Sequence, residues 1–163
     1  MDPLRRARAR ALVGDLTPED MPAWGVTALA HGYDSPLLRK LAGTQDEPRT
    51  VRDLFTGALA ELGAPDLSER QAWWVMAHTY ARSIVAGLVP PEEGAELLWQ
   101  VSSRLDLPPE LLGMLDEATD WAFAWEVDRE EILRGILREA EELLSVVTLE
   151  TLDRELHIDR EPR

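Results

Sequence analysis

The chain has 163 residues, 45% of them hydrophobic, which is the size of one domain with a substantial core. It carries 31 acidic and 17 basic residues, and its formal net charge of −14 opposes binding to nucleic acid or anionic lipid. The absence of cysteine excludes disulfides and thiolate metal sites. We find no signal peptide and no apolar run of membrane-spanning length, so we expect a soluble, cytoplasmic protein.

Apolar residues recur at intervals of three and four along almost the whole sequence, and no stretch of five or more residues alternates cleanly. This spacing is typical of amphipathic helices. We therefore predict an all-α fold, a single domain over residues 1–163 built as a bundle of about seven to nine helices. No internal repeat or linker indicates a second domain.

The first predicted helix, within residues 1–14, forms a basic N-terminal arm. Its apolar residues fall on one side and its arginines elsewhere. The next helix is expected from about residue 17 to 31, with Thr17 as its cap, Pro18 in its first turn and Pro22 delaying or bending it. A short third helix follows at 36–42, capped by Asp34 or Ser35 and ended by Gly43.

A regular apolar stripe predicts the fourth helix at about 48–62, which Gly63 ends. The stripe consists of Val51, Leu54, Phe55, Ala58, Leu59 and Leu62. The fifth helix, at about 69–86, begins at Ser68, and apolar residues cover most of its circumference. Because such a helix is usually surrounded by neighbours, we expect this Trp-rich segment at the centre of the bundle.

The stretch "VPPEEGAELLWQV" at 89–101 predicts a sixth helix. Pro91 suits the first turn, Glu92 and Glu93 suit the positive end of the helix dipole, and Gly94 allows another backbone to approach closely. Helical spacing continues from residue 107 to 125, and again over about 129–146. Residues 148–163 are expected to form one more short helix and a frayed acidic tail.

The pattern P-x-E-G-A-x-x-x-W at Pro91 to Trp99, followed by "LPPELLGMLDEATDW", resembles an uncharacterised family of small helical bacterial proteins. The resemblance covers roughly residues 70–145 and implies a helical fold without implying an activity. In that family an aromatic residue is expected after the first proline and basic residues after the alanine. Glu92, Glu96 and Leu97 stand in those places here.

No motif in the sequence specifies a reaction. The three histidines lie far apart, and H-E-x-x-H, phosphate-binding glycine loops and the nucleophile elbow are all missing. Asp116 and Asp120 share one helical face and could hold Mg²⁺ only with further ligands, so solvated carboxylates are the simpler interpretation. We expect no metal and no cofactor.

Six tryptophans and a concentration of acidic residues toward the C-terminus remain as signals of binding. Trp73 and Trp74 are adjacent on a helix and cannot both point inward in the same direction, so one of them could reach a groove. The candidate binding residues are Trp74, His78, Arg82, Glu93, Trp99, Asp116, Asp120 and Trp125.

We therefore hypothesise a non-enzymatic protein–protein interaction module, a regulator or an immunity-like inhibitor of a basic partner. The alternative is a small enzyme or ligand-binding protein with an inter-helix pocket near His78, Trp99, Asp116 and Asp120. A homodimer through the apolar side of the terminal helices is compatible with either hypothesis.

Overall fold

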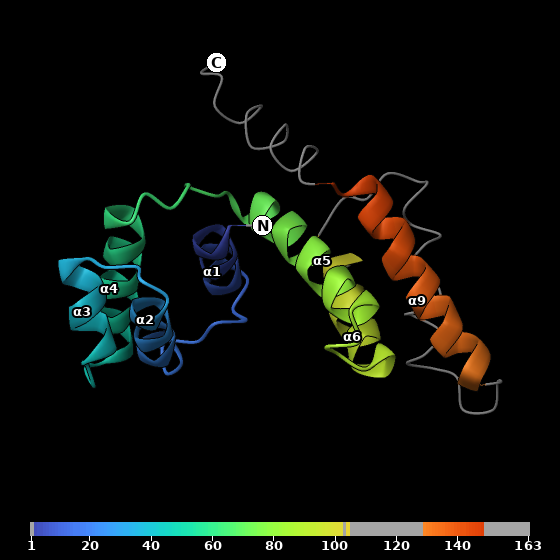
Figure 1. The fold of residues 1–163 in the computed structure, drawn as a ribbon, viewed down its shortest axis with the longest axis horizontal. Coiled ribbons are helices and arrows are strands. Elements are labelled where there is room, and N and C mark those ends of the chain that lie inside the picture. Colours follow the sequence, from blue (N-terminus) through green and yellow to red (C-terminus); the bar gives the residue numbers. More distant parts are fainter. Residues whose placement is uncertain (1, 103, 105–128, 149–163) are drawn as a thin grey trace, which may run out of the picture. The chain divides into compact units, whose positions relative to one another are not determined.

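The computed structural model describes residues 2–102, 104 and 129–148, and every regular element in them is a helix (Figure 1). The all-α prediction is therefore confirmed for this part of the chain. The helices are α1 (Pro3–Leu12), α2 (Met21–Ala30), α3 (Pro36–Ala42), α4 (Pro48–Glu61), α5 (Glu69–Val85), α6 (Pro91–Ser102) and α9 (Arg129–Val146). The helices expected at 107–125 and after residue 148 lie outside the described residues.

The chain divides into two compact units, Met1–Ala72 and Trp73–Arg163. The division falls near the start of α5. The sequence predicts a single-domain bundle around α5. Because that prediction includes both units, it stays a prediction.

The helices of the first unit begin where the sequence placed them, with one exception. Ser35 caps α3, because its hydroxyl accepts a hydrogen bond from the Leu38 amide at 3.2 Å, whereas Asp34 pairs with Arg39. The exception is α2, which begins at Met21 rather than at Pro18. The Thr17 carbonyl accepts from the amides of Asp20 and Met21, which forms a separate turn, and Pro22 lies in the first turn of α2, so the helix starts late, as one of the two expectations for Pro22 has it.

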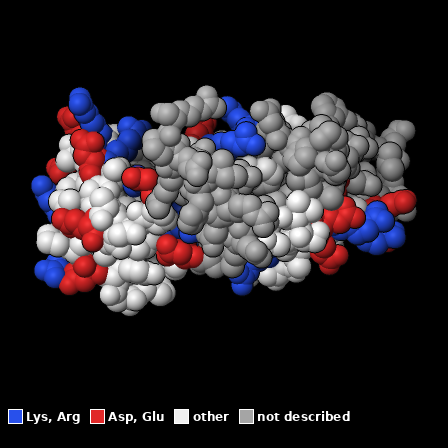
Figure 2. Space-filling model, turned by 90° about the horizontal axis from the view of Figure 1, so that it is seen from above, with Lys and Arg blue, Asp and Glu red and all other residues white. Residues whose placement is uncertain are grey.

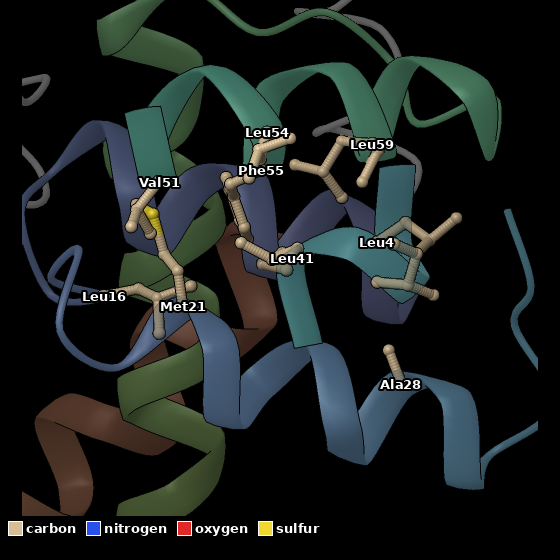
Figure 3. Packing of buried hydrophobic residues seen from close by; sticks show 12 residues of the cluster. Leu4, Leu16, Met21, Ala28, Leu41, Val51, Leu54, Phe55 and Leu59 are labelled. Atoms are coloured by element: carbon tan, nitrogen blue, oxygen red, sulfur yellow. The ribbon is translucent and has the colours of Figure 1, made fainter. Parts of the chain in front are cut away.

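The core of the first unit lies between its four helices (Figure 3). The short helix α3 packs against both α2 and α4. Phe55 from α4 is only 2% exposed, and its ring meets that of Trp24 edge to face with the centroids 5.0 Å apart. The buried side chains of α4 are Val51, Leu54, Phe55, Ala58 and Leu59, as the apolar stripe predicts.

A glycine sets the distance between α2 and α3. A Cβ atom at Gly25 would lie 3.3 Å from the backbone nitrogen of Ala42, which is tighter than normal van der Waals contact. The missing side chain therefore lets the two backbones pack closely and brings Leu38 and Leu41 into the core, where both are fully buried.

Both ends of α5 are closed by local hydrogen bonds. At its start, the Ser68 hydroxyl accepts from the Gln71 amide and the Gln71 side chain accepts from the Ser68 amide, which is a capping box. At its end, Gly87 adopts a φ of 66°, and the amides of Gly87 and Leu88 donate to the carbonyls of Ile84 and Ser83. The sequence placed both boundaries correctly within one residue.

Burial along α5 agrees with its apolar circumference. Its buried residues are Gln71, Ala72, Trp73, Val75, Met76, Ala77, His78, Tyr80, Ala81 and Ile84. Among the polar residues of this helix, Gln71 and His78 are buried, Ser83 is half-buried and Arg82 is exposed.

Helices α6 and α9 pack against each other within the second unit. A Cβ atom at Gly94 would overlap the Cγ1 and Cδ1 atoms of Ile84, so α6 lies close to α5 at this residue, and the group that approaches Gly94 is the Ile84 side chain rather than the expected backbone. The buried face of α9 contains Ile132, Ile136, Ala140, Leu143 and, after the helix, Val147. Glu139 on this face is also buried, which the sequence pattern did not indicate.

The visible surface mixes charges rather than separating them (Figure 2). In that view, acidic and basic side chains of the described residues lie next to one another, with uncharged surface between them. None of the helices in the described ranges is long and apolar enough to cross a membrane.

Candidate functional site

Three of the candidate residues form one row along α5. Trp74, His78 and Arg82 follow one another at intervals of four residues, which places them on one face of the helix. Trp74 is half-buried, His78 is buried at 8% exposure, and Arg82 is exposed. The row therefore reaches the surface at the C-terminal end of α5.

The electrostatics of this row keep the His78 ring neutral. Burial lowers the pKa of His78 because it penalises the imidazolium, and the nearby positive charge of Arg82 lowers this pKa further. A neutral imidazole can accept or donate a proton, but such chemistry also needs a partner group. The described residues contain no group of three or more His, Asp or Glu that could hold a metal ion.

The neighbouring tryptophans Trp73 and Trp74 differ in exposure, as two adjacent helical residues must. Trp73 is 8% exposed and belongs to the core, whereas Trp74 is half-buried. The indole nitrogens of both side chains are buried and have no hydrogen-bond partner in the structure. Trp74 is therefore the one of the pair that extends toward the surface, on the same face as His78.

Helix α6 presents two contrasting faces. Pro91 occupies its first turn, and the Gly94 amide donates to the Pro90 carbonyl at 2.9 Å. One face is buried and carries Gly94, Ala95, Leu98 and Val101. The opposite face, which we call the α6 acidic face, consists of Glu92, Glu93, Glu96 and Trp99.

The α6 acidic face places a tryptophan among carboxylates. Trp99 is 48% exposed, and the exposed Glu96 and Glu93 lie about one and two turns before it, respectively. Glu92 is partly exposed and lies four residues before Glu96, on the same side. A tryptophan with carboxylates nearby on the same exposed helix face is suited to a cationic group.

The remaining candidates, Asp116, Asp120 and Trp125, lie outside the described residues. The pocket expected near His78, Trp99, Asp116 and Asp120 depends on two of them and stays a prediction. Within the described residues, His78 and Trp99 belong to different helices, and only Trp99 lies on an open face.

Sequence reasoning missed a groove in the first unit. This α1–α2 groove has a volume of about 790 Å³ and contains Arg6, Arg10, Trp24, His31 and Tyr33 in its lining. The signal was present in the spacing, because Arg6 and Arg10 are four apart on α1, and Trp24 and His31 are seven apart on α2. A second groove of about 380 Å³ lies beside α1 and α4 and has a largely apolar lining that includes the exposed Leu12.

Comparison with protein-family models gives no match to the chain. Comparison with curated proteins and with solved structures gives none either.

Proposed function

We propose that this chain is a non-enzymatic protein-binding module that takes a basic partner on the α6 acidic face, as a regulator or inhibitor of that partner. The observation that carries the proposal is the 48% exposed Trp99 beside the exposed carboxylates of Glu93 and Glu96. An arginine or lysine of the partner would lie over the indole ring while the carboxylates pair with its charge.

The distribution of charge over the sequence supports this proposal. Residues 73–163 contain 20 acidic and 8 basic side chains, whereas residues 1–72 contain 11 and 9. Most of the net negative charge therefore belongs to the unit that includes α6. Charge of one sign accelerates the encounter with a partner of the opposite sign, and a buried aromatic anchor then slows dissociation.

The proposal also gives the P-x-E-G-A-x-x-x-W pattern a physical meaning. Gly94 and Ala95 are buried and allow α6 to pack closely, while Glu93 and Trp99 lie on the outward face. The pattern would thus combine packing residues and contact residues within one helix. Membership of the small helical bacterial family that carries it remains part of the proposal.

The test is a titration of the full chain with an arginine-rich peptide, followed by calorimetry. We expect Trp99→Ala to weaken binding by about 30-fold, the size of a hot-spot residue near 2 kcal/mol, and Trp99→Phe to retain most of the affinity. Circular dichroism checks that both variants keep their helices. Equal affinity of the wild type and Trp99→Ala would contradict the proposed anchor.

A matched pair of charge variants separates a specific face from general attraction. Glu93→Gln with Glu96→Gln removes two charges from α6, and Glu47→Gln with Asp53→Asn removes two exposed charges from the first unit. We expect the α6 pair to weaken peptide binding by about fivefold and the control pair by less than about twofold. Equal losses would mean that the peptide responds only to net charge.

A further inference from the structure

We propose that the α1–α2 groove binds a small organic anion whose charged group is a carboxylate or phosphate and whose body is aromatic or otherwise apolar. This inference concerns the first unit and is independent of the α6 acidic face. It rests on the size of the groove, on the residues that line it and on the charge that α1 brings to it.

The groove lies between two rows of residues, one on α1 and one along α2. On α1, Pro3, Arg6, Ala7 and Arg10 follow the spacing of one helical face, and on α2 the lining residues recur with the same spacing up to His31. Small side chains at Ala7, Ala23 and Ala28 line the space between these rows. The resulting volume of about 790 Å³ lies within the usual range of small-molecule sites.

The groove is lined by two arginines, one aspartate and several neutral polar side chains. Arg6 is exposed, and Arg10 is held by Asp15, whose carboxylate accepts from its Nε at 2.6 Å. The Nδ1 of His31 donates to the Thr27 carbonyl at 2.8 Å, which fixes the ring, and Nε2 of the neutral imidazole is then a hydrogen-bond acceptor. Asp20 is the acidic lining residue, and its carboxylate accepts from the Thr17 hydroxyl at 2.9 Å.

Because Arg10 already has a carboxylate and Asp20 repels anions, we place the charged group of the ligand at Arg6. A guanidinium binds carboxylate and phosphate through paired hydrogen bonds. Arg6 comes from an arginine-rich segment of a unit in which acidic side chains outnumber basic ones. Within the first 13 residues the balance is reversed, with four arginines and one aspartate.

The aromatic residues of the groove account for the body of the ligand. Trp24 and Tyr33 are half-buried, so each presents part of its ring to the groove while the rest packs on the core. The buried ring of Phe55 contacts the ring of Trp24 edge to face and so helps to hold it in position. A planar or aliphatic body can lie on these rings, which are held in place by the core.

The test uses 1-naphthoate as the probe, titrated into the full chain by calorimetry. Its neutral analogue 1-naphthamide has the same body without the charge, and acetate has the charge without the body. We expect saturable binding of 1-naphthoate, at least about tenfold weaker binding of the amide and no saturable binding of acetate. Absence of 1-naphthoate binding, or equal binding of acid and amide, would overturn the proposal.

Two variants locate the site, each with a matched control. Arg6→Gln removes the proposed anion contact, and Arg49→Gln removes an exposed arginine from α4 outside the groove. Ala23→Leu fills the groove from an exposed position on α2, and Ala30→Leu makes the same change on that helix away from the groove. We expect each groove variant to weaken 1-naphthoate binding by about tenfold and each control by less than about twofold. Equal effects of variant and control would place the bound probe elsewhere.

Discussion

The two units of this chain use the same helical construction to present opposite surface chemistry. The first unit has nearly balanced charge, and its open feature is a groove lined by arginines and aromatic rings. The second unit holds most of the negative charge, and its open feature is a helix face with glutamates around Trp99. In both, a tryptophan lies where a helix meets solvent, and the sign of the neighbouring charges differs.

This difference shows that net charge is a poor guide to the side chains that an individual surface presents. The value of −14 excludes general attraction to polyanions, but it leaves room for a local basic site where the sequence concentrates four arginines. The chemistry of a surface depends on which side chains the helical spacing brings to it. Experiments that alter one unit and observe both therefore test the comparison most sharply.

The largest expected effect comes from removing the aromatic core of the first unit. Phe55→Ala deletes a fully packed ring and its contact with Trp24, and we expect a loss of about 3–5 kcal/mol in the free energy of unfolding. Hydrogen exchange should show lost amide protection mainly in α2, α3 and α4. Equal loss of protection in α6 and α9 would mean that the two units unfold as one.

The next effect in size is at the close contact of the second unit. Gly94→Leu places a side chain where Ile84 is already packed, so we expect a loss of about 1–3 kcal/mol from overpacking. Urea unfolding of the wild type and the variant measures this loss of stability. The exposed Gly43, where an added Cβ would meet only ordinary contacts, provides the control Gly43→Ala. A melting curve unchanged by Gly94→Leu would contradict the packing of α6 on α5.

The smallest predicted effect is the pH response of His78. Because burial lowers its pKa in the folded state, the unfolded chain binds the proton more readily, and stability should fall as the pH drops below the ordinary histidine value. The slope for one proton is at most about 1.4 kcal/mol per pH unit. His78→Gln should flatten the dependence of unfolding free energy on pH between about 5 and 7. The same slope in wild type and variant would assign the response to other groups.

Helix positions were predictable because local rules set them. Prolines in the first turn, glycines after the last turn and the apolar stripe of α4 act over a few residues and appear directly in the sequence. The start of α2 was mispredicted, since Thr17 and Pro18 look like a helix start but form a separate turn. Deciding between the two requires knowing that Met21 must reach the core, which is a tertiary fact.

The sites were less predictable, because they depend on which helix faces lie opposite one another. Trp99 and Glu93 were identified from their residue types, and the structure places both on an open face. Trp24 and His31 were overlooked, because their significance arises only when α2 faces the arginines of α1. The burial of Glu139 and His78 could not be predicted either, because the hydrophobic pattern treats every polar residue as solvent-exposed.

The most direct test of the proposed function is a map of amide chemical-shift changes as the arginine-rich peptide is added to the full chain. The account predicts that the largest changes cluster over α6, around Glu93, Glu96 and Trp99, and that they are absent in Trp99→Ala. Changes spread over acidic residues of both units, or centred on the first unit, would contradict it.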